Sequence, residues 1–171
     1  MSDETDMFVG AAERGDMSTI LRGCEAGMVN VKNQYGWTAA MMAAGSCQFD
    51  VLKALVDHGA DLNIRDNDGY TALMLACGFS PGGHGDDIVR YLLDHGANPS
   101  DGNNDGWTAA HWAAANGYSK SLSLVAVDEV LDVRDKWNDT PLYHAISFNK
   151  PQCVFVLDAA YVSERVRPLH A

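Results

Sequence analysis

Cysteine is scarce in this chain of 171 residues and is never paired in the pattern CxxC. Cys24, Cys47, Cys77 and Cys153 are scattered, which excludes a zinc-ribbon site and makes a disulfide framework a poor expectation. Cys77 and Cys153 are predicted to be free thiols buried in a core, where cysteine behaves as a small apolar residue. The sequence therefore predicts neither a metal site nor a cofactor.

Positive charge is the second shortage. The 12 Lys and Arg residues face 23 Asp and Glu residues, which gives a net charge of −11. Binding to a phosphate backbone depends on clustered Lys and Arg, so nucleic acid is not expected as a partner. Solubility and attraction to a basic partner explain the acidity equally well, because net charge alone does not locate a site.

Long apolar runs are also missing. No stretch approaches the roughly 20 apolar residues that span a bilayer, so no membrane partner is predicted. The segment Met1 to Asp6 is acidic, which argues against a signal or transit peptide. We expect a cytoplasmic or nuclear protein, and the hydrophobic fraction of 47% is ample for the core of one domain.

The chain instead contains a short sequence motif that occurs four times. Each copy closes on a threonine, and these capping threonines are Thr38, Thr71, Thr108 and Thr140. Their spacing is close to 33 residues once an insertion within 79–85 is removed. Self-similarity at such a period predicts stacked supersecondary units that share one core and leave an extended side wall open.

Local signals predict two short helices and a turn in each unit. Each capping threonine precedes an Ala-rich or apolar run, where its hydroxyl can accept a hydrogen bond from the first turn of a helix. Pro141 stands at the first helical position, where proline costs least. Gly59 and Gly96 follow apolar runs, as left-handed caps at the end of a helix do.

These residues resemble the ankyrin repeat. The pattern Asp-x-x-Gly-x-Thr, then an Ala-rich run and an apolar helix ending in Gly-Ala, is clearest over 36–63 and 69–97, and a degenerate copy lies in 8–30. The resemblance implies an all-α ankyrin-repeat solenoid of stacked helix-turn-helix units with short hairpin-like turns, a single domain over 1–171. About five units are expected, with approximate ranges 5–32, 33–65, 66–102, 103–134 and 135–160, and a tail over 161–171.

The resemblance also implies a protein-protein interaction module that binds a protein or peptide on its concave face and turn tips, and no enzyme activity. Binding is expected at positions that the repeat leaves free, which include Asn67 and Asn104. The predicted partner-binding residues are Tyr35, Trp37, Asp68, Tyr70, Phe79, Asp105, Trp107 and Trp137. The acids among them favour a partner of basic character.

Trp37, Tyr70 and Trp107 occupy the same place in three consecutive copies. We expect them to form a row with a spacing on the order of 10 Å, the distance at which helix layers pack. Exposed rings of this kind are typical of interaction hot spots. The alternative is that the rings lie flat against neighbouring turns and stiffen the array.

A second functional hypothesis concerns Trp107 and Trp112. The segment 105–114 resembles the part of the ankyrin domains of histone lysine methyltransferases that binds methyl-lysine in an aromatic cage, where the ammonium group is attracted to ring faces. Ala115 stands where that motif has Glu, and His144 where the next unit has Trp. The alternative reading of Trp112 is that it fills the space between two units.

Three other features have plain structural explanations. The segment 80–87 is rich in glycine but lacks the Lys-Ser/Thr of a phosphate loop, so it reads as a connector, with an enzyme site there as the remaining alternative. His111 is expected to brace its turn by hydrogen bonds. Asn63 resembles the asparagines hydroxylated in ankyrin arrays, but a hydrogen bond to the turn backbone is favoured.

The two ends of the array differ. The first unit is polar, whereas 153–157 in the last unit is a run of five apolar residues. The end of a solenoid needs a polar face or a cover. Cover is expected from Tyr161–Val162 and Val166, or from a partner. The unit 103–134 lacks the Gly-Ala step, so its second helix should be shifted or shortened. We expect a monomer.

Overall fold

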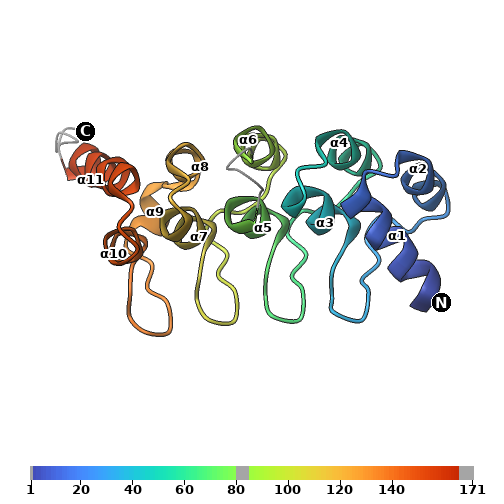
Figure 1. Cartoon of the computed structure of the whole chain (residues 1–171), viewed down its shortest axis with the longest axis horizontal. Helices are drawn as coiled ribbons and strands as arrows, with labels where there is room; N and C mark the ends of the chain where they lie inside the picture. The colour runs from blue at the N-terminus through green and yellow to red at the C-terminus, as the bar shows by residue number, and fades with distance from the viewer. Residues whose placement is uncertain (1, 80–84, 166–171) are drawn as a thin grey trace, which may run out of the picture.

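The computed structural model describes residues 2–79 and 85–165, and within these ranges it contains eleven helices and no strand. The predicted all-α solenoid is confirmed. Figure 1 labels the helices. Their bounds are α1 Ser2–Arg14, α2 Met17–Glu25, α3 Ala39–Gly45, α4 Phe49–Asp57, α5 Ala72–Phe79, α6 Asp86–Asp94, α7 Ala109–Asn116, α8 Ser119–Val125, α9 Asp128–Leu131, α10 Pro141–Ser147 and α11 Pro151–Arg165.

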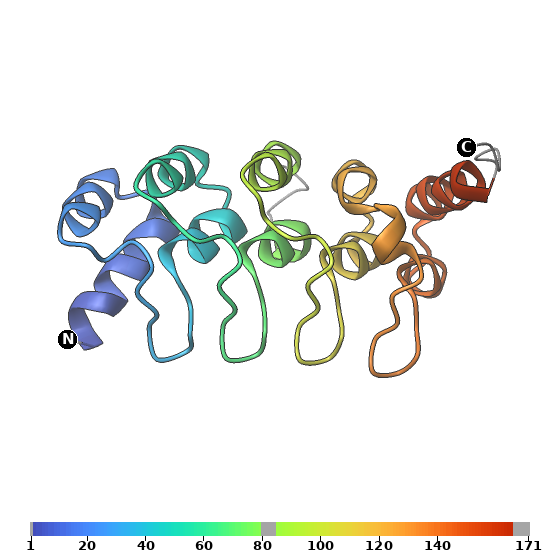
Figure 2. The ribbon, with the colours of Figure 1, turned by 180° about the vertical axis from the view of Figure 1, so that it is seen from behind.

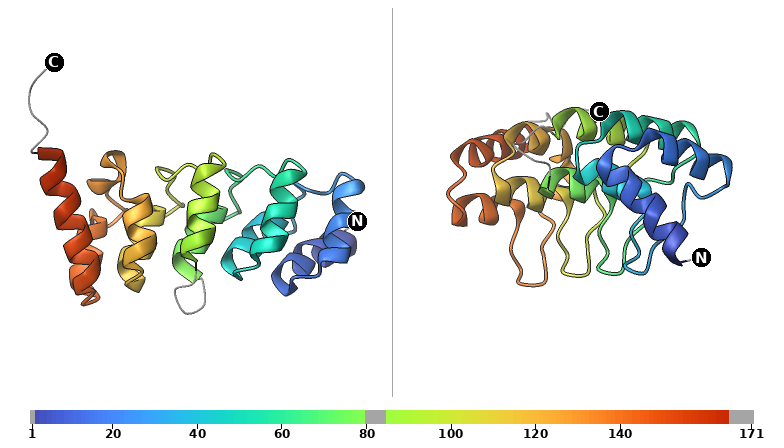
Figure 3. Two further views of the ribbon diagram at one scale, coloured as in Figure 1. Left: turned by 90° about the horizontal axis from the view of Figure 1, so that it is seen from above. Right: turned by 45° about the vertical axis from the view of Figure 1, so that its right-hand side comes forward.

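The helices form two rows along the long axis of the molecule. One row contains α1, α3, α5, α7 and α10, and the second contains α2, α4, α6, α8 and α11 (Figures 1 and 2). Long hairpin-like turns, which we call fingers, project beyond the first row on one side. The view from above shows the helices of the second row side by side (Figure 3). Each unit thus contributes one helix to each row.

Each finger is closed by one side chain at its start. The Oδ1 atom of Asp66 accepts hydrogen bonds from the backbone N–H groups of Asp68 at 3.0 Å and Tyr70 at 2.7 Å. The equivalent residues of the other fingers make the same pair of bonds, and they are Asn33, Asn103 and Asp135. This explains why every copy begins with Asn or Asp, since these side chains mimic a backbone turn.

Neighbouring fingers are bonded to each other. The backbone N–H of Asn67 donates to Tyr35 O at 3.1 Å, and that of Asn104 donates to Asp68 O at 2.9 Å. The side-chain amides of Asn67 and Asn104 also donate, to the backbone of the preceding finger at 3.0 Å. Asn67 and Asn104 thus join the fingers to one another, and their part in binding a partner stays a prediction. Gly69 has φ of 85°, and a Cβ there would lie 2.9 Å from Asn104 N, so glycine is required.

Small residues of the first row let adjacent units approach closely. Ala43, Ala44, Ala113 and Ala114 are fully buried, as larger apolar residues such as Leu52 are in the second row. Burial of apolar surface along the whole array is the main stabilising term. Of the four cysteines, Cys77 and Cys153 are buried and all four are free thiols. Burial raises the pKa of the Cys77 thiol well above its usual value.

The predicted caps are confirmed at three of the four capping threonines. The hydroxyl oxygens of Thr38, Thr71 and Thr140 accept backbone N–H bonds at 3.3 to 3.4 Å. Thr108 is also the N-cap residue of α7, where it forms a capping box with His111: its backbone N–H donates to Nδ1 of His111 at 3.2 Å, and its hydroxyl lies 2.9 Å from the same atom. Gly59 and Gly96 have φ of 85° and 86°, as expected of left-handed caps.

Asn63 makes hydrogen bonds to the next unit. Its Nδ2 donates to Gly96 O at 3.0 Å, and its Oδ1 accepts from the backbone N–H of Asn98 at 2.9 Å. Both ends of the amide are thus engaged, as the bonding interpretation of Asn63 predicted.

The unit 103–134 departs from the others as the sequence indicated. Its helix α8 has seven residues where α4 and α6 have nine, and the short helix α9 follows it. The hydroxyl of Tyr161 on α11 donates to Leu131 O at 2.7 Å, so α11 is attached to this irregular region. Of the segments discussed above, 80–84 and Val166 lie outside the described residues, as does the side chain of Val162.

Candidate functional site

The concave face, on the side of the first helix row and the fingers, is built from two columns of equivalent residues. The residue before each capping threonine forms the aromatic slot, which contains Trp37, Tyr70, Trp107 and Asp139. The residue four positions after each capping threonine forms the floor slot, which contains Met42, Leu75, Trp112 and His144. The first column starts on the fingers and the second lies on the helices of the first row.

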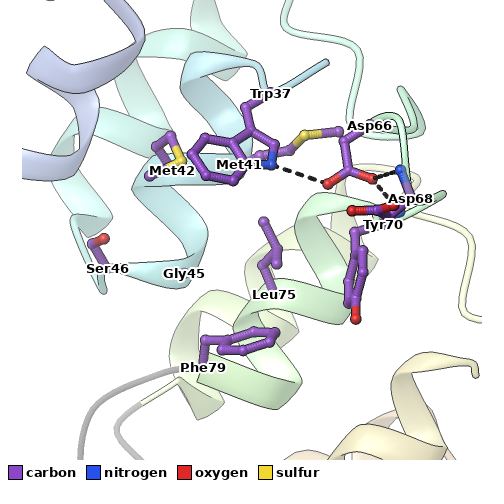
Figure 4. A pocket seen from close by; sticks show the side chains of 10 residues that line it. All are labelled: Trp37, Met41, Met42, Gly45, Ser46, Asp66, Asp68, Tyr70, Leu75 and Phe79. Carbon is purple, nitrogen blue, oxygen red and sulfur yellow. Dashed lines mark hydrogen bonds between the residues drawn. The ribbon is translucent and has the colours of Figure 1, made fainter. Parts of the chain in front are cut away.

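A pocket of about 540 Å³ opens on this face between the units 33–65 and 66–102. Figure 4 shows the ten residues that line it, with Trp37 and Phe79 on opposite sides and Leu75 between them. They are Trp37, Met41, Met42, Gly45, Ser46, Asp66, Asp68, Tyr70, Leu75 and Phe79. Its volume lies within the range of sites that accept a small molecule or a few side chains of a partner.

One edge of the pocket is acidic. Asp66 is committed to structure, because its Oδ2 accepts from Nε1 of Trp37 at 3.1 Å while its Oδ1 closes the finger. Asp68 is exposed, and among the described residues its carboxylate has no ion-pair or hydrogen-bond partner. Burial raises the pKa of Tyr70, so its hydroxyl is protonated at neutral pH. Asp68 is therefore the group able to pair with a cation.

The same face is filled in the units 103–134 and 135–160. The ring of Trp112 contacts Trp107 with centroids 4.7 Å apart, and Tyr70 and Phe79 lie at 5.6 and 5.3 Å. Trp107 also lies 4.4 Å from His144. Gly78 makes room for the indole, since a Cβ at that position would come within 3.1 Å of Trp112. An aromatic residue in the floor slot thus occupies the space that Leu75 leaves open.

The methyl-lysine hypothesis requires an ammonium group to be enclosed by rings. Trp107 and Trp112 are in mutual contact at 4.7 Å, which leaves no room for an ammonium group between them. Their Nε1 atoms are buried and have no hydrogen-bond acceptor among the described residues. This arrangement favours the packing role of Trp112, and the reader function stays a prediction that the ring geometry does not favour.

Four of the eight predicted binding residues meet in the pocket, namely Trp37, Asp68, Tyr70 and Phe79. Tyr35 lies beside it, exposed, with its ring 5.0 Å from that of Trp37. These five residues therefore form one contiguous surface, although they come from two fingers and the end of α5.

The other three predicted residues lie elsewhere. Asp105 forms an ion pair with Lys136, so its charge is already neutralised. Trp107 is packed between Trp112 and His144. Trp137 is exposed at the tip of the last finger, with Nζ of Lys136 4.4 Å from the centre of its ring. The structure does not bring these residues to the pocket.

Sequence reasoning missed Met42, Leu75 and Asp66 as lining residues. Met42 and Leu75 looked like ordinary core residues. A comparison of the floor slot across units would have found them, because Met42 and Leu75 stand where the following unit has the much larger Trp112.

Three buried side chains approach each other between α7 and α10. His111, Asp135 and His144 place one nitrogen or oxygen atom each within 4.8 Å of one another. His144 Nε2 lies 2.8 Å from Asp135 Oδ2. Two imidazoles and a carboxylate are common ligands of Zn²⁺. This group does not form a local sequence motif, because its members come from two different units.

The hydrogen bonds of His111 oppose a metal at this group. Its Nδ1 accepts from the backbone N–H of Thr108 at 3.2 Å, which leaves the ring proton on Nε2 to be donated to Asp139 O at 3.3 Å. A metal on Nε2 would replace the bond to Asp139 O and would move the ring proton to Nδ1, where it would lose the bond from the backbone N–H of Thr108 and could donate only to the Thr108 hydroxyl at 2.9 Å. Burial lowers the pKa of His111 to about 4, so the ring is neutral. His111 thus braces two units, as predicted.

Comparison with known proteins identifies the family. A model of ankyrin repeats (3 copies) matches residues 8–103, 67–129 and 87–161. The chain belongs to the ankyrin repeat family. Ankyrin repeats generally mediate protein–protein interactions. In the described part of this ankyrin repeat protein, no helix is both long and apolar enough to cross a bilayer.

The matched relatives are longer ankyrin repeat proteins. The chain is similar to the ankyrin repeat, SAM and basic leucine zipper domain-containing protein 1 of Notamacropus eugenii, with 38% identity over 76 residues, which is 44% of this chain and 15% of the relative. The ankyrin repeat-containing protein P1E11.10 of Schizosaccharomyces pombe is 36% identical over 76 residues, 44% of this chain and 37% of the relative. The chain thus spans well under two thirds of either relative.

Proposed function

We propose that this ankyrin repeat protein binds a protein or peptide partner along its concave face, and that the partner is anchored in the pocket beside Trp37. The pocket carries the proposal, because it is an open apolar site on a face that is filled by side chains farther along the array. Large rings at the edge of such a site supply contact area at a low cost in conformational entropy. The function is binding rather than catalysis.

The chemistry of the pocket suggests which residues the partner inserts. Met42, Leu75 and Phe79 offer an apolar wall, and Asp68 offers an unpaired carboxylate beside the ring of Tyr70. A Lys or Arg side chain can lay its methylene groups on the apolar wall and place its charge near Asp68. The net charge of −11 also attracts a basic partner over longer distances. We therefore propose a segment with a basic residue next to a bulky apolar residue.

The fingers that carry Trp37 and Tyr70 are preorganised. Asp66 fixes both, since it closes its own finger and binds the indole N–H of Trp37 in the preceding one. A surface held in this way loses little conformational entropy when the partner binds, which leaves more of the contact energy for affinity.

Selection from a library of random peptides displayed on phage tests this proposal on the full chain. We expect enriched peptides that share Lys or Arg adjacent to an aromatic or aliphatic residue, and loss of their binding to the Trp37→Ala variant. Trp137→Ala is the matched control, because Trp137 is also an exposed tryptophan on a finger but lies outside the pocket. Enrichment that survives Trp37→Ala and fails with Trp137→Ala would place the site elsewhere and refute the proposal.

Titration with lysine-containing peptides, methylated and unmethylated, addresses the reader hypothesis separately. Binding that requires methylation and is lost in Trp112→Leu would support it. Equal binding of both peptides would remove it.

A further inference from the structure

The surroundings of Trp112 show how an indole fits between two units of the concave face. Its ring contacts the aromatic slots of its own and of the preceding unit, with centroids 4.7 Å from Trp107 and 5.6 Å from Tyr70. Two more contacts come from the residues seven and eight positions after the preceding capping threonine. A Cβ at Gly78 would lie 3.1 Å from the indole, and the ring of Phe79 lies 5.3 Å away. Four slots thus hold this indole.

The pocket beside Trp37 is lined by the same four slots, one unit earlier. Around Leu75 in the floor slot they contain Tyr70, Trp37, Gly45 and Ser46, and all four residues line the pocket (Figure 4). Gly45 leaves its wall open, because even a Cβ there would lie 3.5 Å from the Cβ of Leu75. The side chain of Leu75 is much smaller than an indole. The pocket therefore contains the space that an indole fills in the next unit.

One of the four slots differs between the two places. Ser46 stands in the slot that Phe79 occupies beside Trp112, and it brings a hydroxyl group to the wall of the pocket. The indole N–H of Trp112 is buried and has no acceptor among the described residues. A buried donor without an acceptor costs free energy, and a hydroxyl oxygen is an acceptor. The pocket thus offers an indole a polar partner that Trp112 does not have.

We propose that the partner is anchored by a tryptophan side chain, which lies over Leu75 as Trp112 lies in the next unit. This inference rests on the proposed binding function and names the bulky residue that the partner inserts. The indole contacts the rings of Trp37 and Tyr70, and ring pairs stabilise beyond the area they bury. The basic residue next to it pairs with Asp68 at the edge of the pocket. The partner thereby supplies the ring that the other half of the concave face supplies from its own chain.

Isothermal titration of the full chain with three peptides tests the inference. The peptides share the sequence Gly-Ser-Lys-X-Ser-Gly, in which X is Trp, Phe or Leu. We expect the Trp peptide to bind at least roughly tenfold more tightly than the Leu peptide, with the Phe peptide between them. The preference should disappear in Leu75→Trp, because the chain's own indole then fills the site. Phe155→Trp is the matched control, since it adds an indole at an exposed position outside the pocket and should keep the preference. Circular dichroism verifies that both variants are folded.

Methyl NMR locates the bound peptide. In a chain with labelled Leu and Met methyl groups, the signals of Leu75 and Met42 should shift when the Trp peptide is added, because both side chains line the pocket and would feel the ring current of the indole. The Leu75→Met variant identifies the Leu75 signals by their loss.

The outcomes separate this inference from the proposed function. Equal affinity for the Trp and Leu peptides, with Met42 shifts that are lost in Trp37→Ala, would retain the pocket as the binding site and overturn the tryptophan anchor. A preference for Trp that persists in Leu75→Trp would overturn the anchor as well. So would the absence of methyl shifts with all three peptides up to about 1 mM, while the phage selection decides the pocket proposal independently.

Discussion

The two halves of the concave face use the same slots and reach opposite results. In the half formed by the units 33–65 and 66–102, Trp37 and Tyr70 stand over the aliphatic residues Met42 and Leu75, and a pocket of about 540 Å³ remains. In the other half the floor slot contains Trp112 and His144, whose rings pack against Trp107. The difference teaches that the size of one residue per unit decides whether a rigid solenoid offers a binding site.

The two halves also differ in whether the acidic residue of the finger is paired with a cation. Asp68 and Asp105 stand in equivalent positions of consecutive fingers. Asp105 is paired with Lys136, while Asp68 beside the open pocket has no partner among the residues that the structure describes. The half with room for a partner is thus also the half with an available charge.

Removal of Trp112 should reveal the largest difference in stability between the two halves of the concave face. Trp112→Ala is expected to destabilise the protein by about 4 kcal/mol, because three aromatic neighbours lose their packing. Leu75→Ala in the same slot should cost only about 2 kcal/mol, since one side of Leu75 already faces the pocket. Urea unfolding measures both. Equal losses would mean that the two halves are packed alike.

The pH dependence of stability sharpens the contrast between His111 and its counterparts Met41 and Met74. The pKa of His111 is near 6.5 when unfolded and about 4 when folded, so the unfolded chain binds the additional proton between these values. Stability should therefore be complete above pH 6.5 and decline as the pH falls to 4, by on the order of 3 kcal/mol.

His111→Met is the control for that measurement, because methionine is the residue that the preceding units use. It should flatten the stability profile between pH 6.5 and 4. Asp135 contributes in a different window. Burial raises its pKa, but this is outweighed by hydrogen bonds from the backbone N–H of Asp139 and from His144, so its net pKa is lowered and its stabilisation is lost only below about pH 3.8. A profile unchanged by His111→Met would contradict the role of His111.

A larger residue at position 75 should fill the pocket and make this half of the concave face resemble the half that contains Trp112. Leu75→Trp places in the floor slot the residue that the next unit has there, and Gly45 leaves space as Gly78 does for Trp112. We expect the affinity for the selected peptides to fall at least roughly tenfold, about 1.4 kcal/mol, by fluorescence anisotropy. Leu75→Met keeps the volume and should bind as before. Undiminished binding to the Leu75→Trp variant would show that the pocket is not used.

The smallest effect is expected from the acids. Asp68→Asn should weaken peptide binding about threefold and reduce its dependence on salt, because an exposed charge contributes at most about 1 kcal/mol. Asp105→Asn, in which the lost charge was already paired with Lys136, should change affinity less. Titrations at two salt concentrations measure both variants. A larger loss of affinity in Asp105→Asn than in Asp68→Asn would argue against a cation beside Asp68.

Repetition in the sequence determined the fold and the caps. A threonine before each Ala-rich or apolar run, an Asn or Asp at the start of each finger and glycines at left-handed positions act mainly within their own unit, so they can be interpreted from the local sequence. The irregular second helix of the unit 103–134 was also predictable, since the Gly-Ala step that ends such helices is missing there.

Only the tertiary structure decided which aromatic residues are available. Trp37 and Trp107 occupy the same slot and look equivalent in sequence, but one borders a pocket and the other is covered, because their neighbours in the next unit are Leu75 and His144. Availability depends on contacts between units, and these become visible only when the units are stacked.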